Sequence, residues 1–281
     1  MSGHQDASGP HAGQPVLHAA KPLGAAPVVV ILVHGRGAGP ENILDLVPAL
    51  GVVDVTYLAP AAANRTWYPY GFMSDIAKNE PYLSSALSVL ASLVARVEAS
   101  GVARDHVVIG GFSQGACLTT EFAIRNASRF GGVVAFSGGA IGPPGTTWAT
   151  ENARAAEGTE SAEDPRATEG TESAEDPRAA EGTESAEDPR AAEGTESAED
   201  PRATEGTEST DSRPRNFNGT PIFFGCSDVD PHIPELRVRE SAEVCARMGA
   251  EVTTRIYPGM GHLVNDDEIM WVKRLLDSLA S

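Results

Sequence analysis

Residues 107–117 are Val107-Val-Ile-Gly-Gly-Phe-Ser-Gln-Gly-Ala-Cys117, an apolar run that ends in a glycine-flanked turn. The β-branched start predicts a buried strand, and the apolar spacing after the turn predicts a helix. Gly111 and Gly115 lie two residues to either side of Ser113, as a turn this tight requires, because it leaves no room for side chains. The stretch therefore predicts a nucleophile elbow, in which a strained serine presents its hydroxyl at the N-terminus of a helix.

Strands and helices alternate on both sides of this motif. Runs of β-branched or aromatic residues between turns predict buried strands, and apolar residues every three to four positions predict helices. The expected strands are residues 27–33, 52–58, 107–111, 131–137, 220–225 and 251–257. The expected helices are residues 42–50, 84–100, 114–126 and 234–248, and a C-terminal helix that begins at about residue 266. This order implies right-handed crossovers and an α/β fold, a doubly wound, mostly parallel sheet with helices on both faces.

The net charge of −18 is concentrated in one part of the 281-residue chain, since residues 155–215 carry 19 acidic and 6 basic groups. Residues 155–202 are four copies of a twelve-residue unit, Ala-(Ala/Thr)-Glu-Gly-Thr-Glu-Ser-Ala-Glu-Asp-Pro-Arg. The unit contains nothing more apolar than alanine, so stacked copies could not bury a core. We expect a single domain over residues 16–281, interrupted at 155–213 by a disordered acidic repeat insertion, and a disordered leader at residues 1–15.

Composition argues against several classes of partner. The residues outside 155–215 have a net charge of only −5, which argues against a nucleic-acid-binding face and against attraction to anionic membranes. The N-terminus lacks the features of a secretory signal, and the longest apolar run, residues 28–33, is too short to span a membrane, so no stable membrane insertion is expected. Three cysteines without metal-ligand spacing indicate buried thiols in a cytoplasmic protein, expected to be a monomer or a homodimer.

A second glycine-rich loop, His34-Gly-Arg-Gly-Ala-Gly39, follows the first expected buried strand. It lacks the Lys-Ser/Thr of a P-loop and the spacing of a dinucleotide-binding loop. The H-G-x-G form matches the loop that supplies one oxyanion-hole N–H group in serine hydrolases, here from Arg36 beside the N–H of Gln114. In such a loop His34 is expected to order the backbone rather than to transfer protons.

The loop at residues 59–72 holds Trp67, Tyr68, Tyr70 and Phe72, in a chain that is only 6% aromatic. Two interpretations remain open. These rings pack the long loop onto the domain, or Trp67 and Tyr68 form an apolar wall for a substrate, because loops at the carboxyl ends of parallel strands form the binding site.

Three candidate catalytic groups follow expected strands in the order Ser113, the acidic loop at residues 228–230, and His262. A serine hydroxyl needs a base to remove its proton, and the base needs an anion that fixes its tautomer. Either Asp228 or Asp230 could supply this anion. No cluster of His, Cys and carboxylates has metal-ligand spacing, so we expect neither metal nor cofactor.

Four motifs together resemble the phospholipase/carboxylesterase family of α/β-hydrolases, which includes the acyl-protein thioesterases: His34-Gly-Arg-Gly37, Gly111-Phe-Ser-Gln-Gly115, Ser227-Asp-Val-Asp-Pro-His-Ile-Pro234 and Gly259-Met-Gly-His262. The resemblance covers residues 27–142 and 216–281 and implies the α/β-hydrolase fold. In the family the acid directly precedes proline, which implies Asp230 as the triad acid. It also implies a small-molecule ester as substrate, with thioesters or lysophospholipids as further possibilities, hydrolysed through an acyl-enzyme.

Two other functions are compatible with the same chain. A hydrolase fold can serve as a non-catalytic binding protein, because fold does not imply function. The acidic tract could make the chain an interaction protein, although such tracts are usually only solvated. The intact set of Ser113, Asp230 and His262, with the oxyanion loop at Arg36, favours the enzyme.

Overall fold

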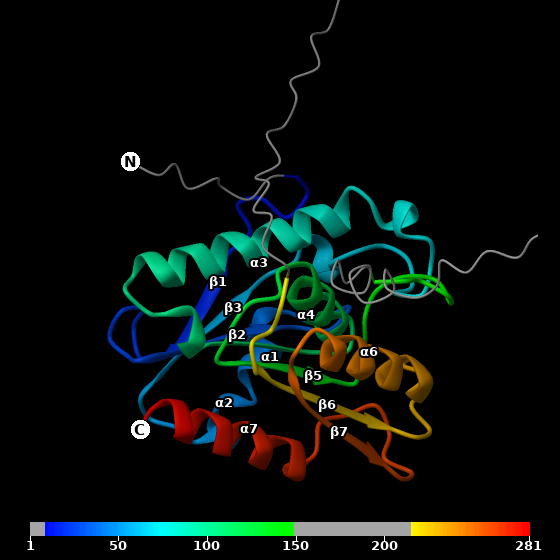
Figure 1. Cartoon of the computed structure of the whole chain (residues 1–281). Helices are drawn as coiled ribbons and strands as arrows, with labels where there is room; N and C mark the ends of the chain where they lie inside the picture. Colours follow the sequence, from blue (N-terminus) through cyan, green and yellow to red (C-terminus); the bar gives the residue numbers. More distant parts are fainter. Residues whose placement is uncertain (1–8, 149–214) are drawn as a thin grey trace, which may run out of the picture. The chain divides into compact units, whose positions relative to one another are not determined.

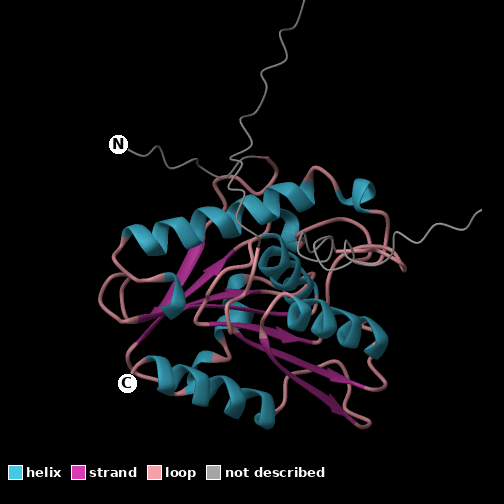
Figure 2. Ribbon diagram, in the orientation of Figure 1, coloured by secondary structure: helices cyan, strands magenta, loops and turns pink. Residues whose placement is uncertain are grey.

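The computed structural model describes residues 9–148 and 215–281. Within them, strands form one seven-stranded sheet in the order β1-β3-β2-β4-β5-β6-β7 (Figures 1 and 2). All neighbouring strands are parallel except β1 and β3. The bounds are β1 (Val16–Ala20), β2 (Val28–Val33), β3 (Val55–Pro60), β4 (Val107–Phe112), β5 (Gly132–Phe136), β6 (Pro221–Ser227) and β7 (Glu251–Tyr257). The expected α/β fold is confirmed.

Helices cover both faces of this sheet (Figure 1). Helices α3, α4 and α6 pack one apolar cluster, and α1, α2 and α7 pack the other. The helices are α1 (Pro40–Leu44), α2 (Val47–Leu50), α3 (Tyr82–Ala99), α4 (Gln114–Arg125), α6 (Glu235–Arg247) and α7 (Asp266–Leu279), with 3₁₀ turns η1 (Ala63–Arg65), η2 (Ile76–Asn79) and η3 (Arg104–His106).

The central strands are buried on both faces, as their continuous apolar sequences predict. All six residues of β2 and all five of β5 are buried. In the register of the sheet, Ile109 of β4 lies opposite Ile31 on one side and Val133 on the other. Because β2, β4, β6 and β7 run parallel, the loops that follow them leave the sheet at the same edge.

One expected helix is divided in the structure, the strand expected at residues 52–58 lies at Val55–Pro60, and one strand was not expected. The helix expected at residues 42–50 is divided into α1 and α2, because Pro48 has no N–H to donate to the preceding turn and its ring clashes there. Strand β1 was not expected at all. It is a half-exposed edge strand, antiparallel to β3, and its sequence has no buried apolar run.

The leader expected at residues 1–15 is wrong for residues 9–15, while residues 1–8 lie outside the described residues. His11 is only 1% exposed, and its ring packs at a tilt against Trp67, with centroids 5.5 Å apart. Its backbone N–H donates to Ser85 Oγ at 2.9 Å. The segment before β1 is therefore part of the domain. The repeat insertion expected at 155–213 also lies outside the described residues.

Helix α3 is, among the described helices, the one that is long and apolar enough to cross a membrane by length and composition. Its apolar side chains instead lie in the core, where Leu83, Leu90 and Val97 are fully buried against the sheet. Burial of an apolar face against a sheet explains the same composition in a globular domain.

Candidate active site

Ser113 lies in the sharp turn between β4 and α4, with φ 54° and ψ −119°. This strained conformation is held by the backbone, since its N–H donates to Phe136 O at 2.9 Å. Glycine is required on both sides. A Cβ on Gly111 would lie 2.5 Å from the carbonyl carbon of Gly115, and a Cβ on Gly115 would overlap the carbonyl oxygen of Val33. The turn has the geometry that the elbow sequence predicts.

Asp230 and His262 form the second part of the site. Asp230 Oδ2 lies 2.7 Å from His262 Nδ1, and its Oδ1 accepts hydrogen bonds from the N–H groups of His232 and Ile233 at 2.9 and 3.0 Å. Burial favours a raised pKa for Asp230, but the hydrogen bonds from His262 and from these two N–H groups outweigh it, so the pKa is lowered. Asp230 is therefore an anion bound to the imidazole at neutral pH.

Asp228 has a different partner. Its Oδ1 accepts a hydrogen bond from the Gly259 N–H at 2.8 Å, and its own N–H donates to Tyr257 O at 3.3 Å. It therefore joins the loop after β6 to the loop that carries His262. Of the two acids that the sequence leaves open, Asp230 is the one in contact with the imidazole.

The backbone N–H groups of Arg36 and Gln114 make no hydrogen bond within the described part of the chain, and both residues line the same cavity as Ser113. Their side chains have a separate structural role that the sequence did not reveal. Arg36 donates to the carbonyl oxygens of Tyr68, Pro69 and Tyr70 at 2.7–2.9 Å. Gln114 Nε2 also donates to Tyr68 O, at 2.8 Å. The aromatic loop is thus fixed to both residues that are expected to form the oxyanion hole.

His34 orders the backbone of the glycine-rich loop at residues 34–39, as expected. The Ala62 N–H donates to its Nε2 at 3.1 Å, so the proton is on Nδ1, which lies 2.8 Å from Gly35 O. Burial lowers the pKa of His34, which favours this neutral form. Both ring nitrogens are occupied by backbone groups, and neither faces Ser113.

The structure separates the two aromatic residues assigned to the substrate wall. Trp67 is fully buried and does not line the cavity. Its Nε1 donates to His34 O at 2.9 Å, so its expected role in substrate binding is wrong, because the ring is used to pack the loop. Tyr68 does line the cavity, and its ring lies under the Arg36 guanidinium, 5.9 Å away.

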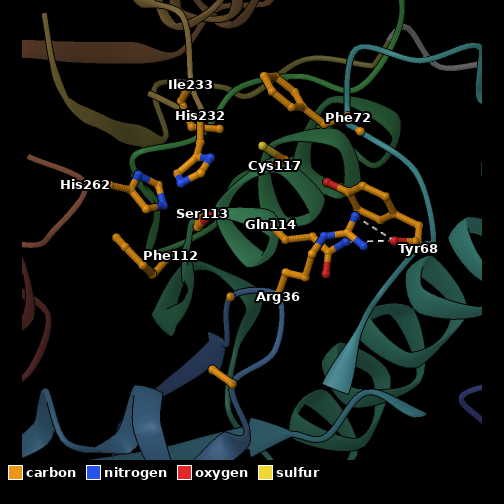
Figure 3. A pocket seen from close by; sticks show the side chains of 13 residues that line it. Arg36, Tyr68, Phe72, Phe112, Ser113, Gln114, Cys117, His232, Ile233 and His262 are labelled. Carbon is orange, nitrogen blue, oxygen red and sulfur yellow. Dashed lines mark hydrogen bonds between the residues drawn. The ribbon is translucent and has the colours of Figure 1, made fainter. Parts of the chain in front are cut away.

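A cavity of about 420 Å³ opens above Ser113. In Figure 3, Ser113 lies between His262 on one side and Gln114 and Arg36 on the other. Phe112 packs against the His262 ring, with centroids 4.7 Å apart, and His232 packs against it at 4.9 Å. The lining residues are Gly35, Arg36, Ala38, Tyr68, Gly71, Phe72, Phe112, Ser113, Gln114, Cys117, His232, Ile233 and His262.

Several of these lining residues were not expected from the sequence as parts of the binding site, namely Phe112, Cys117, His232 and Ile233. Phe112, His232 and Ile233 lie inside the quoted motifs and Cys117 lies two residues after Gly115, and that position is the signal that could have identified them. Among the described residues, no group of three or more His, Cys, Asp or Glu could hold a metal ion. The chemistry available in the cavity is that of a hydroxyl, an imidazole–carboxylate pair, the Arg36 guanidinium and backbone N–H groups.

Comparison with known proteins agrees with this geometry. The phospholipase/carboxylesterase family model matches residues 18–157. Acyl-protein thioesterase 1 of Eremothecium gossypii is 33% identical over 93 residues, 32% of this chain and 36% of that protein. Lysophospholipase-like protein 1 of Mus musculus is 23% identical over 134 residues, 42% of this chain and 56% of that protein. The matches thus span between a third and just over half of these relatives.

Solved structures cover the chain more fully. The phospholipase/carboxylesterase from Dyadobacter fermentans has 29% sequence identity and a TM-score of 0.67, and the match covers 96% of this chain and 99% of that one. Esterase PE8, at 17% identity and a TM-score of 0.59, shares the fold. With the elbow at Ser113 and the Asp230–His262 pair, these matches show that the chain has the α/β-hydrolase fold and is similar to the phospholipase/carboxylesterase family.

Proposed function

We propose that this protein is a serine esterase that hydrolyses small carboxylic esters through Ser113, His262 and Asp230. The observation that carries the proposal is the Asp230–His262 hydrogen bond of 2.7 Å at the wall of a cavity that also contains the strained Ser113. This arrangement contains a nucleophile, a base and a group that orients the base.

The reaction follows from the positions of these groups. With Nδ1 of His262 bonded to Asp230, Nε2 is left to accept the Ser113 proton as Oγ attacks the carbonyl carbon. The N–H groups of Arg36 and Gln114 would then donate to the oxyanion, at the positive end of α4. His262 returns the proton to the leaving alcohol, and an activated water molecule hydrolyses the acyl-enzyme.

The substrate class rests on the cavity and on the relatives. Phe72, Phe112 and Ile233 give the cavity an apolar wall, which suits a short acyl chain. Matched relatives are an acyl-protein thioesterase and a lysophospholipase-like protein, so thioesters and lysophospholipids are further candidate substrates. Each proposed step uses groups of the chain itself and needs no cofactor.

An activity-based probe tests the proposal directly. A fluorophosphonate should label the wild-type protein, and Ser113→Ala should abolish the labelling. Ser278→Ala, an exposed serine on α7, is the matched control and should label normally. Labelling retained in Ser113→Ala, or no labelling and no ester hydrolysis by the wild type, would show that Ser113 is not a catalytic nucleophile and favour a binding protein on a hydrolase fold.

A further inference from the structure

The cavity wall contains one permanent cation that no carboxylate neutralises. The Arg36 guanidinium has five N–H donors, and three are used on the carbonyl oxygens of Tyr68, Pro69 and Tyr70. The N–H of Nε and one N–H of Nη1 remain without a partner among the described residues. Arg36 is exposed and forms no ion pair with a described carboxylate. Its full charge is therefore held in a fixed position and faces the cavity.

No group in the lining carries a negative charge at neutral pH that could neutralise Arg36. Burial raises the pKa of the Cys117 thiol to about 12 and raises the pKa of Tyr68 well above its ordinary value, so both stay protonated. His232 and His262 are neutral or cationic in every state. The carboxylate of Asp230 is fully buried behind His262 and is bonded to it.

The sign of this charge is opposite to that of the chain. The protein has a net charge of −18, and such a field repels anions at long range. The cavity nevertheless combines an unneutralised guanidinium with the positive end of α4, which begins at Gln114. A neutral ester would leave this local excess of positive charge without a partner.

The positions of the groups indicate which part of the substrate would carry the anion. His262 must protonate the leaving alcohol, so the alcohol lies on the His262 side of Ser113. Arg36 lies across Ser113 from His262 (Figure 3). A group bound by Arg36 is therefore in the acyl part, which stays attached to Ser113 after the alcohol leaves.

We propose that the physiological ester has an acyl part that ends in a carboxylate, a half-ester or half-thioester of a short dicarboxylic acid, and that the Arg36 guanidinium binds this carboxylate. This inference rests on the proposed esterase function, because it names the substrate of that same site. A charge-assisted hydrogen bond is among the stronger polar interactions available. This hydrogen bond favours an acyl part that ends in a carboxylate over a neutral acyl part of similar length.

Two p-nitrophenyl esters of the same dicarboxylic acid test the proposal. p-Nitrophenyl hydrogen adipate carries the carboxylate, and p-nitrophenyl methyl adipate is its neutral counterpart. At low salt, kcat/KM of the wild type should be about tenfold higher for the anionic ester, and this ratio should shrink as salt screens the charge. In Arg36→Gln the ratio should fall to about one or below. Arg247→Gln, an exposed arginine at the end of α6, makes the same change in net charge and should keep the wild-type ratio.

The neutral ester separates loss of structure from loss of recognition, because Arg36 also holds the loop at residues 68–70. Arg36→Lys keeps the charge without the planar donors, and should keep part of the preference. Hydrolysis of the neutral ester with no preference for the anion in the wild type, or a preference unchanged in Arg36→Gln, would overturn this inference and leave the esterase proposal intact. Hydrolysis of neither ester, without probe labelling, would overturn the esterase proposal itself.

Discussion

Asp228 and Asp230 are two residues apart in the loop after β6, and only one of them contacts the imidazole. Asp230 Oδ2 is bonded to His262 Nδ1, whereas Asp228 Oδ1 accepts from the Gly259 N–H. Asparagine at 230 would place an amide where the imidazole needs an acceptor that fixes its tautomer. Asparagine at 228 keeps an oxygen that can accept the same backbone hydrogen bond.

We therefore expect Asp230→Asn to lower kcat on the order of 10⁴-fold, and Asp228→Asn to lower it less than about tenfold, because a backbone hydrogen bond is retained. Steady-state kinetics with p-nitrophenyl methyl adipate measures both variants. Asp228→Ala, which removes the acceptor, should have an intermediate effect. Comparable losses in the two asparagine variants would contradict the assignment of the triad acid.

Glu268 is a buried carboxyl group near the loop of His262. Its Oε2 accepts from the Asn265 N–H at 2.8 Å, and Asn265 Oδ1 accepts from the Glu268 N–H at 3.0 Å, which forms a capping box. Its Oε1 is buried beside Gly225 and has no hydrogen-bond partner in the described part of the chain. Burial raises the pKa of Glu268 to about 7.

The sign of the resulting pH dependence follows from linkage. The folded-state pKa of about 7 is above the unfolded value of 4.5, so the contribution of Glu268 to stability is full below pH 4.5 and is lost as the pH rises through 7. Glu268→Gln should remove this loss, which is on the order of 2 kcal/mol. Urea unfolding at pH 5 and pH 8 should show that the free energy of unfolding decreases less with pH in Glu268→Gln than in the wild type. An equal decrease in wild type and Glu268→Gln would refute this, and the exposed Glu243→Gln serves as control.

At the scale of elements, the segment before β1 supports the aromatic loop. His11 Nδ1 accepts from the Ala63 N–H at 3.1 Å, so Nε2 carries the proton and donates to Trp67 O at 2.9 Å. Burial lowers the pKa of His11, because the charged form would lose hydration and could no longer accept the Ala63 N–H. Loss of the ring would leave the buried Trp67 carbonyl oxygen and the partly buried Ala63 N–H without partners.

We expect His11→Ala to destabilise the protein by about 2 kcal/mol or more, the cost of such unpaired groups. Because the pKa of His11 is lowered in the folded state, its contribution to the stability of the fold is full above pH 6.5, the unfolded value. This contribution is lost as the pH falls below 6.5. Thermal unfolding at pH 7 and pH 5 should therefore show a larger acid-induced loss in wild type than in His11→Ala. His106→Ala, at a half-exposed site, is the control, and a Tm unchanged in His11→Ala would contradict the packing role.

At the scale of the whole molecule, the described residues on both sides of 149–214 are fixed to the domain. Trp148 Nε1 donates to the buried Glu121 at 3.4 Å, and the Arg237 guanidinium lies over its ring at 5.2 Å. On the other side, Phe217 is fully buried and its N–H donates to Met248 O at 2.8 Å. Both ends are therefore held by contacts within the domain.

Replacing residues 155–213 by a short Gly-Ser linker should preserve the fold and the hydrolysis of a neutral ester. Closing a shorter connection costs less entropy, about 0.6 kcal/mol for each halving of its length, so Tm should stay the same or rise slightly. Differential scanning calorimetry and turnover of p-nitrophenyl methyl adipate check this. A variant that unfolds, or that folds without activity, would show that the tract is required by the domain.

The alternation of strands and helices and the order of Ser113, the acid and His262 could be predicted from the sequence, because both depend on local patterns. β-branched runs between turns predicted β2, β4 and β5, and glycines two residues on either side of a serine predicted the elbow. Parallel strands bring their following loops to one edge, so the motifs could also be expected to meet there.

Other features depend on contacts between residues far apart in the chain, which no local pattern contains. Burial of Trp67 under His34, the binding of Arg36 to the loop at residues 68–70 and the insertion of His11 beside that loop were each decided by packing. The residue type alone does not show whether an aromatic or a cationic side chain packs in the core or lines a cavity. Which of these it does is settled only when the neighbouring elements place it, because burial and hydrogen-bond partners are properties of the tertiary structure.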